Sequence, residues 1–216
     1  MSAHEVETAA GRVTADGKFF RLEGKKFYLK GVTYGPFAPD ERGETFGARG
    51  QVAADFSLVR DLGANLLRVY YPPPRWFLDL AQEQGLKVLV DIPWPKHLCF
   101  LDTEETQAQA RETVRRTVAE AQGHPAVFAF SVVNEIPAEI VRWSGARRVE
   151  AFIDELVEVA RSQDPACLCT FTNYPPTEFL RPRLIDFVCF NVYLHRPKEY
   201  EAYLARLQML ADTKPL

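Results

Sequence analysis

The stretch Val127-Phe-Ala-Phe-Ser-Val-Val-Asn134-Glu135 decides the fold class, because an almost wholly apolar run leads into an amide and then a carboxylate. Such a run is typical of a parallel strand covered on both faces, since a strand with one wet face alternates apolar and polar residues. Pro137 follows two residues later and has no N–H to give to a neighbouring strand. Glu135 is therefore expected at the carboxyl end of a buried parallel strand.

Five further runs of the same kind lie along the chain. The predicted strands cover residues 27–34, 65–71, 87–92, 127–135, 167–173 and 187–193. Apolar residues spaced by three and four predict helices between them, over residues 52–62, 76–84, 106–122, 148–162 and 199–211. This alternation predicts a parallel sheet or barrel with helices outside it.

The ends of the predicted strands distinguish a barrel from an open sheet. All six end in polar or aromatic residues that are followed closely by proline. An open sheet builds its site in one crevice, whereas every strand of a (β/α)8 barrel contributes to one mouth. We therefore predict an α/β fold, a TIM barrel that is incomplete because residues 27–216 hold only about six βα units.

The length of 216 residues fits one large domain. Residues 1–17 are expected to form a tail. Residues 18–30 are expected to form a β-hairpin, in which Gly24 gives the turn its conformational freedom. The remaining residues are expected to form the barrel.

Composition excludes several classes of partner. The formal net charge is −3 without a cluster of Lys and Arg, so nothing favours a nucleic acid or a membrane surface. No run approaches the roughly 18 apolar residues of a membrane span. The first residues, MSAHEVETAAGR, lack the apolar core of a secretory signal. The four cysteines show no metal-ligand spacing and are expected as buried thiols. A cytoplasmic location is therefore favoured.

Glu135 is the main candidate for catalysis. A carboxyl group at the rim of an apolar barrel loses part of its hydration, which favours its protonated form. Such a group can donate a proton near neutral pH, and Asn134 beside it can bind a substrate hydroxyl. The alternative is a strand-end glutamate paired with a lysine of a helix.

Three further residues are candidates for the same site. Arg68 lies in an apolar run, and a buried arginine needs a carboxylate partner, either at the mouth or in a structural ion pair inside the barrel. Asn191 and Tyr193 are two residues apart in the last predicted strand and are expected to share a face. A phenol there can hydrogen-bond a catalytic carboxylate.

Aromatic residues near the strand ends are candidates for stacking on sugar rings, with plain packing as the alternative. They are Trp94, Tyr34, Tyr71 and Tyr174. Asp91, His97 and His195 also lie near strand ends. A metal site built from them would need a convergent geometry that the sequence does not show, so no metal is expected.

These features resemble the retaining glycoside hydrolases of the (β/α)8-barrel clan that includes families 2 and 5, with family 2 the nearer. The resemblance runs from about Phe27 to Leu216. The matching pieces are Lys30 to Tyr34, Asn65 to Arg68, Val133 to Glu135, Asn191 to Tyr193, and the ending Lys214-Pro-Leu216, which is similar to the lead-in of the family's seventh strand.

The resemblance implies hydrolysis of a β-linked oligo- or polysaccharide by double displacement, without a cofactor. Glu135 would be the acid/base and Asn134 would contact the sugar 2-hydroxyl. Arg68 and Tyr193 would support the nucleophile. Trp94, Asn191 and Tyr34 complete the expected set of substrate-binding residues.

The family's nucleophile is a glutamate at the end of the seventh strand, and no residue of this sequence matches it. Asp91, Asp102 and Glu178 lie on the wrong strand or in loops, so none is nominated. This chain alone is therefore expected to be inactive or severely impaired. An incomplete barrel also has open strand edges, which favour self-association. The alternatives are a non-catalytic sugar-binding barrel, a fragment that needs a partner chain, and a different barrel enzyme in which Glu135 abstracts a proton.

Overall fold

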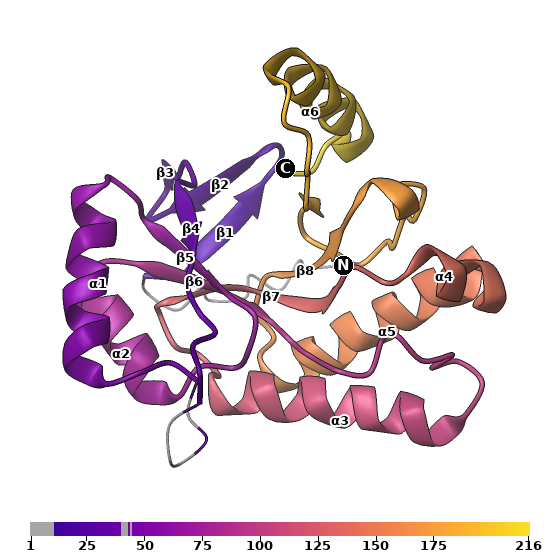
Figure 1. Cartoon of the computed structure of the whole chain (residues 1–216), viewed down its shortest axis with the longest axis horizontal. Coiled ribbons are helices and arrows are strands. Elements are labelled where there is room, and N and C mark those ends of the chain that lie inside the picture. Colours follow the sequence, from indigo (N-terminus) through magenta and orange to yellow (C-terminus); the bar gives the residue numbers. More distant parts are fainter. Residues whose placement is uncertain (1–10, 40–42, 44) are drawn as a thin grey trace, which may run out of the picture.

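The computed structural model describes residues 11–39, 43 and 45–216. Its centre is a six-stranded parallel sheet that curls around an apolar interior, with each strand beside its neighbour in chain order (Figure 1). The strands are β4 (Gly31–Thr33), β5 (Leu66–Val69), β6 (Lys87–Asp91), β7 (Val127–Asn134), β8 (Cys169–Asn173) and β9 (Cys189–Phe190). All six predicted strands are present, and the prediction of an incomplete α/β barrel is confirmed.

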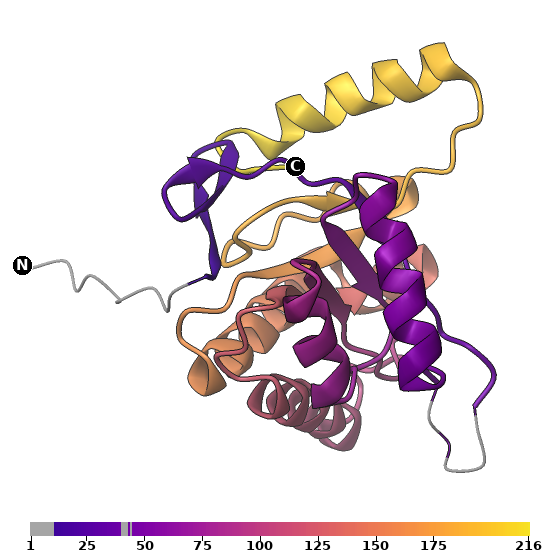
Figure 2. The same ribbon diagram turned by 90° about the vertical axis from the view of Figure 1, so that its left-hand side faces the viewer.

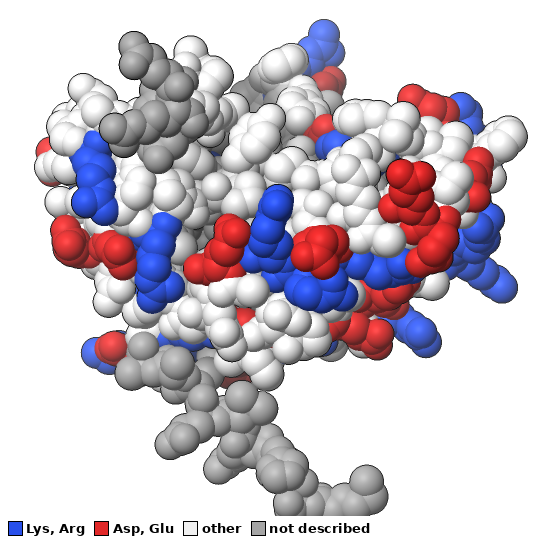
Figure 3. Space-filling view, turned by 90° about the horizontal axis from the view of Figure 1, so that it is seen from below, with Lys and Arg blue, Asp and Glu red and all other residues white. Residues whose placement is uncertain are grey.

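Helices follow the strands, and most of them cover the outer side of the sheet, whereas the last helix stands apart from that layer (Figure 1). They are α1 (Arg49–Asp61), α2 (Arg75–Glu83), α3 (Glu104–Glu120), α4 (Ala138–Ser144), α5 (Ala146–Gln163), the 3-10 turn η1 (Pro175–Thr177) and α6 (Pro197–Ala211). The short helix α4 is absent from the sequence prediction. On the face that carries α3, acidic and basic side chains are interspersed rather than gathered by sign (Figure 3).

Two apolar cores flank the curled sheet. The larger core fills the layer between the strands and the helices and includes Phe56, Phe77 and Ile153. The smaller core lies inside the curl, where Phe20 packs edge-on against Phe128 and Phe187 at ring distances of 5.0 and 5.2 Å. Because both faces of the strands are covered, the strands read as nearly continuous apolar runs.

A small antiparallel sheet supplies Phe20 to the inner core. It consists of β1 (Val13–Asp16), β2 (Phe19–Leu22) and β3 (Lys25–Lys26), so the predicted hairpin is confirmed. The prediction that residues 1–17 form a tail is wrong for β1, where Val13 pairs with Leu22 and is buried in the inner core. Residues 1–10 lie outside the described part of the chain.

The curled sheet has two edges, β4 and β9, which do not pair with each other in the described residues. A cavity of about 910 Å³ lies between them, and Tyr200 and Leu204 of α6 border it. Figure 2 shows α6 spanning this side of the molecule. The Val188 N–H donates to Pro215 O at 2.9 Å, so the last residues run beside the start of β9. Self-association through these edges stays a prediction.

No helix in the described residues is long and apolar enough to cross a membrane.

Candidate active site

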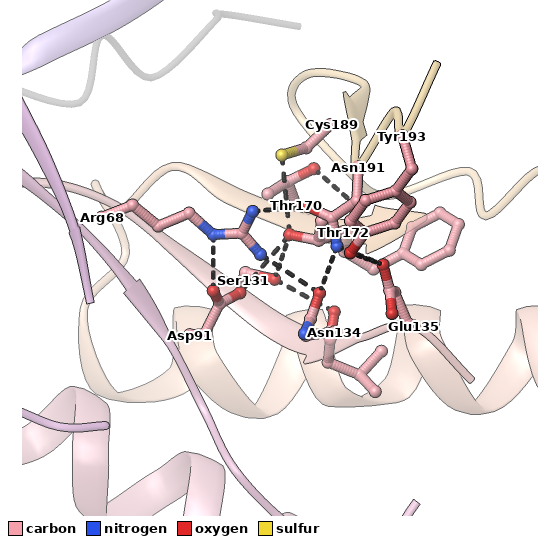
Figure 4. Close-up of polar contacts among 12 residues, drawn as sticks. Arg68, Asp91, Ser131, Asn134, Glu135, Thr170, Thr172, Cys189, Asn191 and Tyr193 are labelled. Atoms are coloured by element: carbon pink, nitrogen blue, oxygen red, sulfur yellow. Dashed lines mark hydrogen bonds and ion pairs between the residues drawn. The ribbon is translucent and has the colours of Figure 1, made fainter. Parts of the chain in front are cut away.

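Arg68 is the centre of a polar network at the carboxyl ends of the strands (Figure 4). Its Nε donates to Asp91 Oδ2 at 2.7 Å. Its two terminal nitrogens donate to Asn191 Oδ1 at 2.6 Å and to Asn134 Oδ1 at 3.1 Å. Arg68 thus forms an ion pair inside the barrel and also holds side chains at the mouth. The two roles that the sequence offered as alternatives for Arg68 are therefore combined in one residue.

The Arg68–Asp91 ion pair is largely shielded from water. Burial alone would lower the pKa of Arg68, but the charge of Asp91 and the hydrogen bond to it outweigh burial and raise that pKa. Asp91 is only 2% exposed and also accepts a weak hydrogen bond from Thr172 Oγ1 at 3.4 Å. A buried charge with partners on both oxygens holds its neighbours in a fixed arrangement.

Glu135 is fixed through its backbone and through one of its two oxygens. Its N–H donates to Thr172 O at 2.8 Å, and its φ of +48° lies in the left-handed region that side chains with a Cβ rarely adopt. Asn191 Nδ2 and Tyr193 Oη donate to the same oxygen, Oε1, at 2.5 and 2.8 Å. Within the described residues, Oε2 accepts no hydrogen bond.

Asn134, like Glu135, is fixed by hydrogen bonds to only one of its two terminal side-chain atoms. Its Oδ1 accepts hydrogen bonds from Arg68 at 3.1 Å and from Asn191 at 2.9 Å. The described residues offer no acceptor to its amide Nδ2. These two contacts determine which end of the amide is the oxygen, so the NH2 group is the end left for a ligand.

Tyr193 is a donor at the edge of this network. Partial burial of its hydroxyl, the hydrogen bond to Glu135 and the charge of that carboxylate raise the pKa of Tyr193 to about 12, although the residue as a whole is 65% exposed. The prediction that Asn191 and Tyr193 share a face of a strand is wrong, because β9 ends at Phe190. Their loop nevertheless brings both side chains to Glu135.

The structure corrects two predicted sugar contacts. Tyr34 Oη donates to Asp55 of α1 at 2.7 Å, and its ring lies in the core between sheet and helices, so its prediction as a mouth residue is wrong. Trp94 borders the mouth but is buried. Its Nε1 donates to Val132 O at 2.8 Å and its ring packs against Phe100, which leaves little ring surface for stacking.

A small pocket of about 230 Å³ adjoins the network, and Asn134, Tyr71 and Lys96 are among the residues that line it. Sequence reasoning missed Lys96, whose ammonium has no hydrogen-bond partner in the described residues. Burial lowers the pKa of Lys96, while the charges of Glu135 and Asp91 partly offset that effect. The signal was present in the sequence, because Lys96 follows the Pro-Trp-Pro run at a strand end.

The other carboxylates considered from the sequence are engaged elsewhere. Asp91 is paired with Arg68. Asp102 accepts a hydrogen bond from Trp143 Nε1 at 2.8 Å. Glu178 forms an ion pair with Arg206, which is the main cause that lowers the pKa of Glu178. In the part of the chain that the structure describes, no cluster of three His, Cys, Asp or Glu residues can hold a metal ion.

The chain is similar to known proteins of one family. The family model described as "Glycosyl hydrolases family 2, TIM barrel domain" matches residues 13–215. The chain is 26% identical over 205 residues to a β-glucuronidase of Paenibacillus borealis, covering 88% of this chain and 33% of that protein. It is 28% identical over 204 residues to human β-glucuronidase, covering 90% of this chain and 29% of that protein. The chain therefore spans about a third of the length of these relatives.

Solved structures share the fold. A crystal structure of Ruminococcus gnavus β-glucuronidase superposes with a TM-score of 0.77 at 19% identity, covering 94% of this chain and 38% of that one. A Bacteroides uniformis β-glucuronidase 2, covalently bound to cyclophellitol-6-carboxylate aziridine, gives a TM-score of 0.75 at 19% identity, covering 92% of this chain and 25% of that one.

Proposed function

We propose, on the premise that this chain belongs to the TIM-barrel domain family of glycosyl hydrolases family 2, that it carries the acid/base half of a retaining β-glycosidase site. Glu135 is the acid/base in this proposal. It protonates the glycosidic oxygen of the leaving group while a carboxylate nucleophile attacks the anomeric carbon. In the second step Glu135 takes a proton from the water that releases the sugar.

One observation carries the proposal: Glu135 is held by one oxygen and open at the other. Asn191 and Tyr193 fix Oε1, so Oε2 has a defined position and no competing partner in the described residues. A general acid needs both properties, because the proton must stand in hydrogen-bond reach of the reacting oxygen. A strand-end glutamate with a purely structural role would use both oxygens in contacts or expose both to water.

Asn134 and Lys96 support the placement of a sugar beside Glu135. The amide NH2 of Asn134 is the group left for a ligand, and it suits the oxygen of a sugar hydroxyl such as the 2-hydroxyl. Lys96 borders the same pocket and offers further N–H donors. Arg68 and Asp91 act on the sugar only through Asn134 and Asn191, which they hold in place.

The proposed substrate class is a β-linked glycoside. The relatives named above are β-glucuronidases, so an aryl β-D-glucuronide is the first substrate to assay. The β-D-glucoside, β-D-galactoside and β-D-mannoside with the same aryl group belong in the same assay, because the described residues alone do not select one sugar.

The test is Glu135→Gln in the protein as its source organism makes it. Glutamine keeps an acceptor for Asn191 and Tyr193 but cannot supply a proton, so turnover of a phenyl glycoside should fall by about 10²–10⁴-fold. With a 2,4-dinitrophenyl glycoside, whose leaving group needs no proton in the first step, azide should replace water in the second step, restore part of the rate and yield a β-glycosyl azide. The matched control is Glu139→Gln on the exposed side of α4, which should leave the rate unchanged. Unchanged turnover in Glu135→Gln would contradict the assignment.

The nucleophile is proposed to lie outside residues 1–216, since Asp91, Asp102 and Glu178 are engaged in other contacts. The 216-residue chain alone should then show no turnover, whereas a longer product of the same gene should. Sugar binding without turnover in that longer protein would favour a non-catalytic barrel. Turnover that depends on an added divalent metal would favour a different barrel enzyme.

A further inference from the structure

Trp143 is exposed on the short helix that follows Glu135. It lies on α4 and is 69% exposed, whereas Trp76 is half-buried and Trp94 is buried. Large apolar side chains occur singly on many protein surfaces, so exposure alone does not identify a site. The neighbours of Trp143 distinguish it from such residues.

The Trp143 side chain is fixed although it is exposed. Its Nε1 donates to Asp102 Oδ2 at 2.8 Å. Val141 anchors α4 in the core, and Leu101 anchors the loop that carries Asp102. The donor and the acceptor of this hydrogen bond therefore both belong to segments that are anchored in the core. Asp102 Oδ1 accepts no hydrogen bond from the described residues, so a free acceptor lies beside the indole ring.

Trp143 and Asp102 lie at the same end of the barrel as Glu135. The loop of Asp102 follows β6 and also carries Lys96, and α4 follows β7 (Figure 1). Trp143 lies eight positions after Glu135 in the sequence, which limits their Cα separation to about 18 Å for three extended and five helical steps. Other exposed apolar side chains follow neighbouring strand ends, namely Leu98, Phe179 and Tyr193.

We propose that Trp143 and Asp102 form a platform for the leaving-group part of a saccharide substrate. The proposal rests on the proposed function, because an acid that protonates the glycosidic oxygen stands on the side of the leaving group. The indole face covers the C–H face of a pyranose, and Asp102 Oδ1 accepts a hydrogen bond from a sugar hydroxyl. The substrate is then an oligo- or polysaccharide that extends beyond the cleaved bond, rather than a glycoside of a small aglycone.

The experiment measures saccharide binding by the 216-residue chain with Glu135→Gln, in which no probe can be cleaved. The probes are four β-linked tetrasaccharides, of 1,4-glucose, 1,3-glucose, 1,4-xylose and 1,4-N-acetylglucosamine. Acrylamide quenching of tryptophan fluorescence reports mainly on Trp143, because Trp94 is buried and Trp76 is half-buried. We expect at least one probe to protect the indole from acrylamide.

Variants then assign the binding to the platform. Trp143→Ala should raise the dissociation constant of the tetrasaccharide about tenfold, and Asp102→Ala should raise it by less. Tyr28→Ala is the matched control, because Tyr28 is 64% exposed in the loop after the N-terminal hairpin, and it should change nothing. Equal dissociation constants for Trp143→Ala and its parent, or no protection by any of the four probes, would overturn the platform. This result is separate from the proposed function, whose failure shows as unchanged turnover in Glu135→Gln.

Discussion

Among the described residues, two arginine–aspartate pairs are buried, one at each end of the sheet. At the amino ends of the strands, Arg12 Nη1 donates to both oxygens of Asp164 at 2.8 Å, and Asp164 also accepts the N–H groups of Gly123 and Ala166. Here the buried carboxylate is satisfied by residues of the protein alone. At the carboxyl ends, Arg68 of the Arg68–Asp91 pair also donates to Asn134, which stands beside Glu135. Asn134 Nδ2 and Glu135 Oε2 have no hydrogen-bond partner in the described residues.

The two pairs have different roles: one stabilises the fold, and the other positions residues of the candidate site. The side chains of Arg12 and Asp164 are 3% and 5% exposed and join β1 to the loops before β7 and β8. That pair holds the N-terminal sheet in the barrel. The Arg68–Asp91 pair sets the direction of two asparagine amides at the mouth. In barrels of this kind the carboxyl ends carry the chemistry and the amino ends carry stability.

The largest expected effect is on stability at the amino end. Asp164→Ala removes the partner of a buried guanidinium, so the free energy of unfolding should fall by about 3–5 kcal/mol. Urea unfolding measures the loss. The control is Glu112→Ala, which breaks an exposed pair with Arg115 on α3 and should change the free energy by less than about 1 kcal/mol. Equal losses in the two variants would contradict a role for the Arg12–Asp164 pair in stability.

The same pair predicts how stability depends on pH. Burial alone would raise the pKa of Asp164, but the hydrogen bonds from Arg12 and Gly123 outweigh it and lower that pKa below its ordinary 3.8. A carboxyl whose pKa is lowered by folding stabilises the protein above its unfolded pKa and loses that effect as pH falls. The gap in unfolding free energy between the wild type and Asp164→Asn should therefore be constant near neutral pH and narrow below about pH 4. A gap that persists to pH 2 would contradict the lowered pKa.

At the mouth, the expected effect on stability is close to zero. Glu135→Gln retains an acceptor for Asn191 and Tyr193, and the left-handed backbone at this position is no harder for glutamine than for glutamate. The free energy of unfolding should change by less than about 0.5 kcal/mol. A loss comparable with that of Asp164→Ala would show that Glu135 is a structural residue, and the contrast between the two ends would fail.

The smallest expected effect concerns Lys96. Glu135 raises the pKa of Lys96 against the lowering effect of burial, so Glu135→Gln should lower that pKa further. Reductive methylation with ¹³C labels allows NMR to follow each lysine, and Lys96→Arg assigns the signal. A control measurement on Lys87, near the amino end, should give the same pKa in both proteins. Identical titration of Lys96 with and without the Glu135 carboxylate would place the two groups too far apart to share a site.

Much of this architecture is predictable because parallel strands leave a strong pattern. The run from Val127 to Asn134 is buried on both faces, so it predicts both β7 and the position of Glu135 at its end. Tyr34 shows where the pattern fails. It precedes a proline at a strand end as a mouth residue would, but its side chain turns outward to Asp55, and only the placement of α1 reveals that.

Short elements account for two further failures. β9 has two residues, too few for parity to assign Asn191 and Tyr193 to a face, and the loop rather than the strand brings them to Glu135. α4 is a helix of seven residues with only three buried, so it gives no clear period. The platform residue Trp143 lies on that helix, and therefore sequence reasoning did not consider it.

If Glu135 supplies the proton to the leaving group, the loss of activity in Glu135→Gln must depend on how much the leaving group needs that proton. The ratio of kcat/KM for wild type to that for Glu135→Gln is determined for a 2,4-dinitrophenyl glycoside and for the phenyl glycoside of the same sugar. We expect a small ratio for the dinitrophenyl glycoside, because dinitrophenolate leaves without a proton, and a ratio larger by about 10²-fold or more for the phenyl glycoside. Equal ratios for the two leaving groups would contradict this role of Glu135, because the loss would then not depend on protonation.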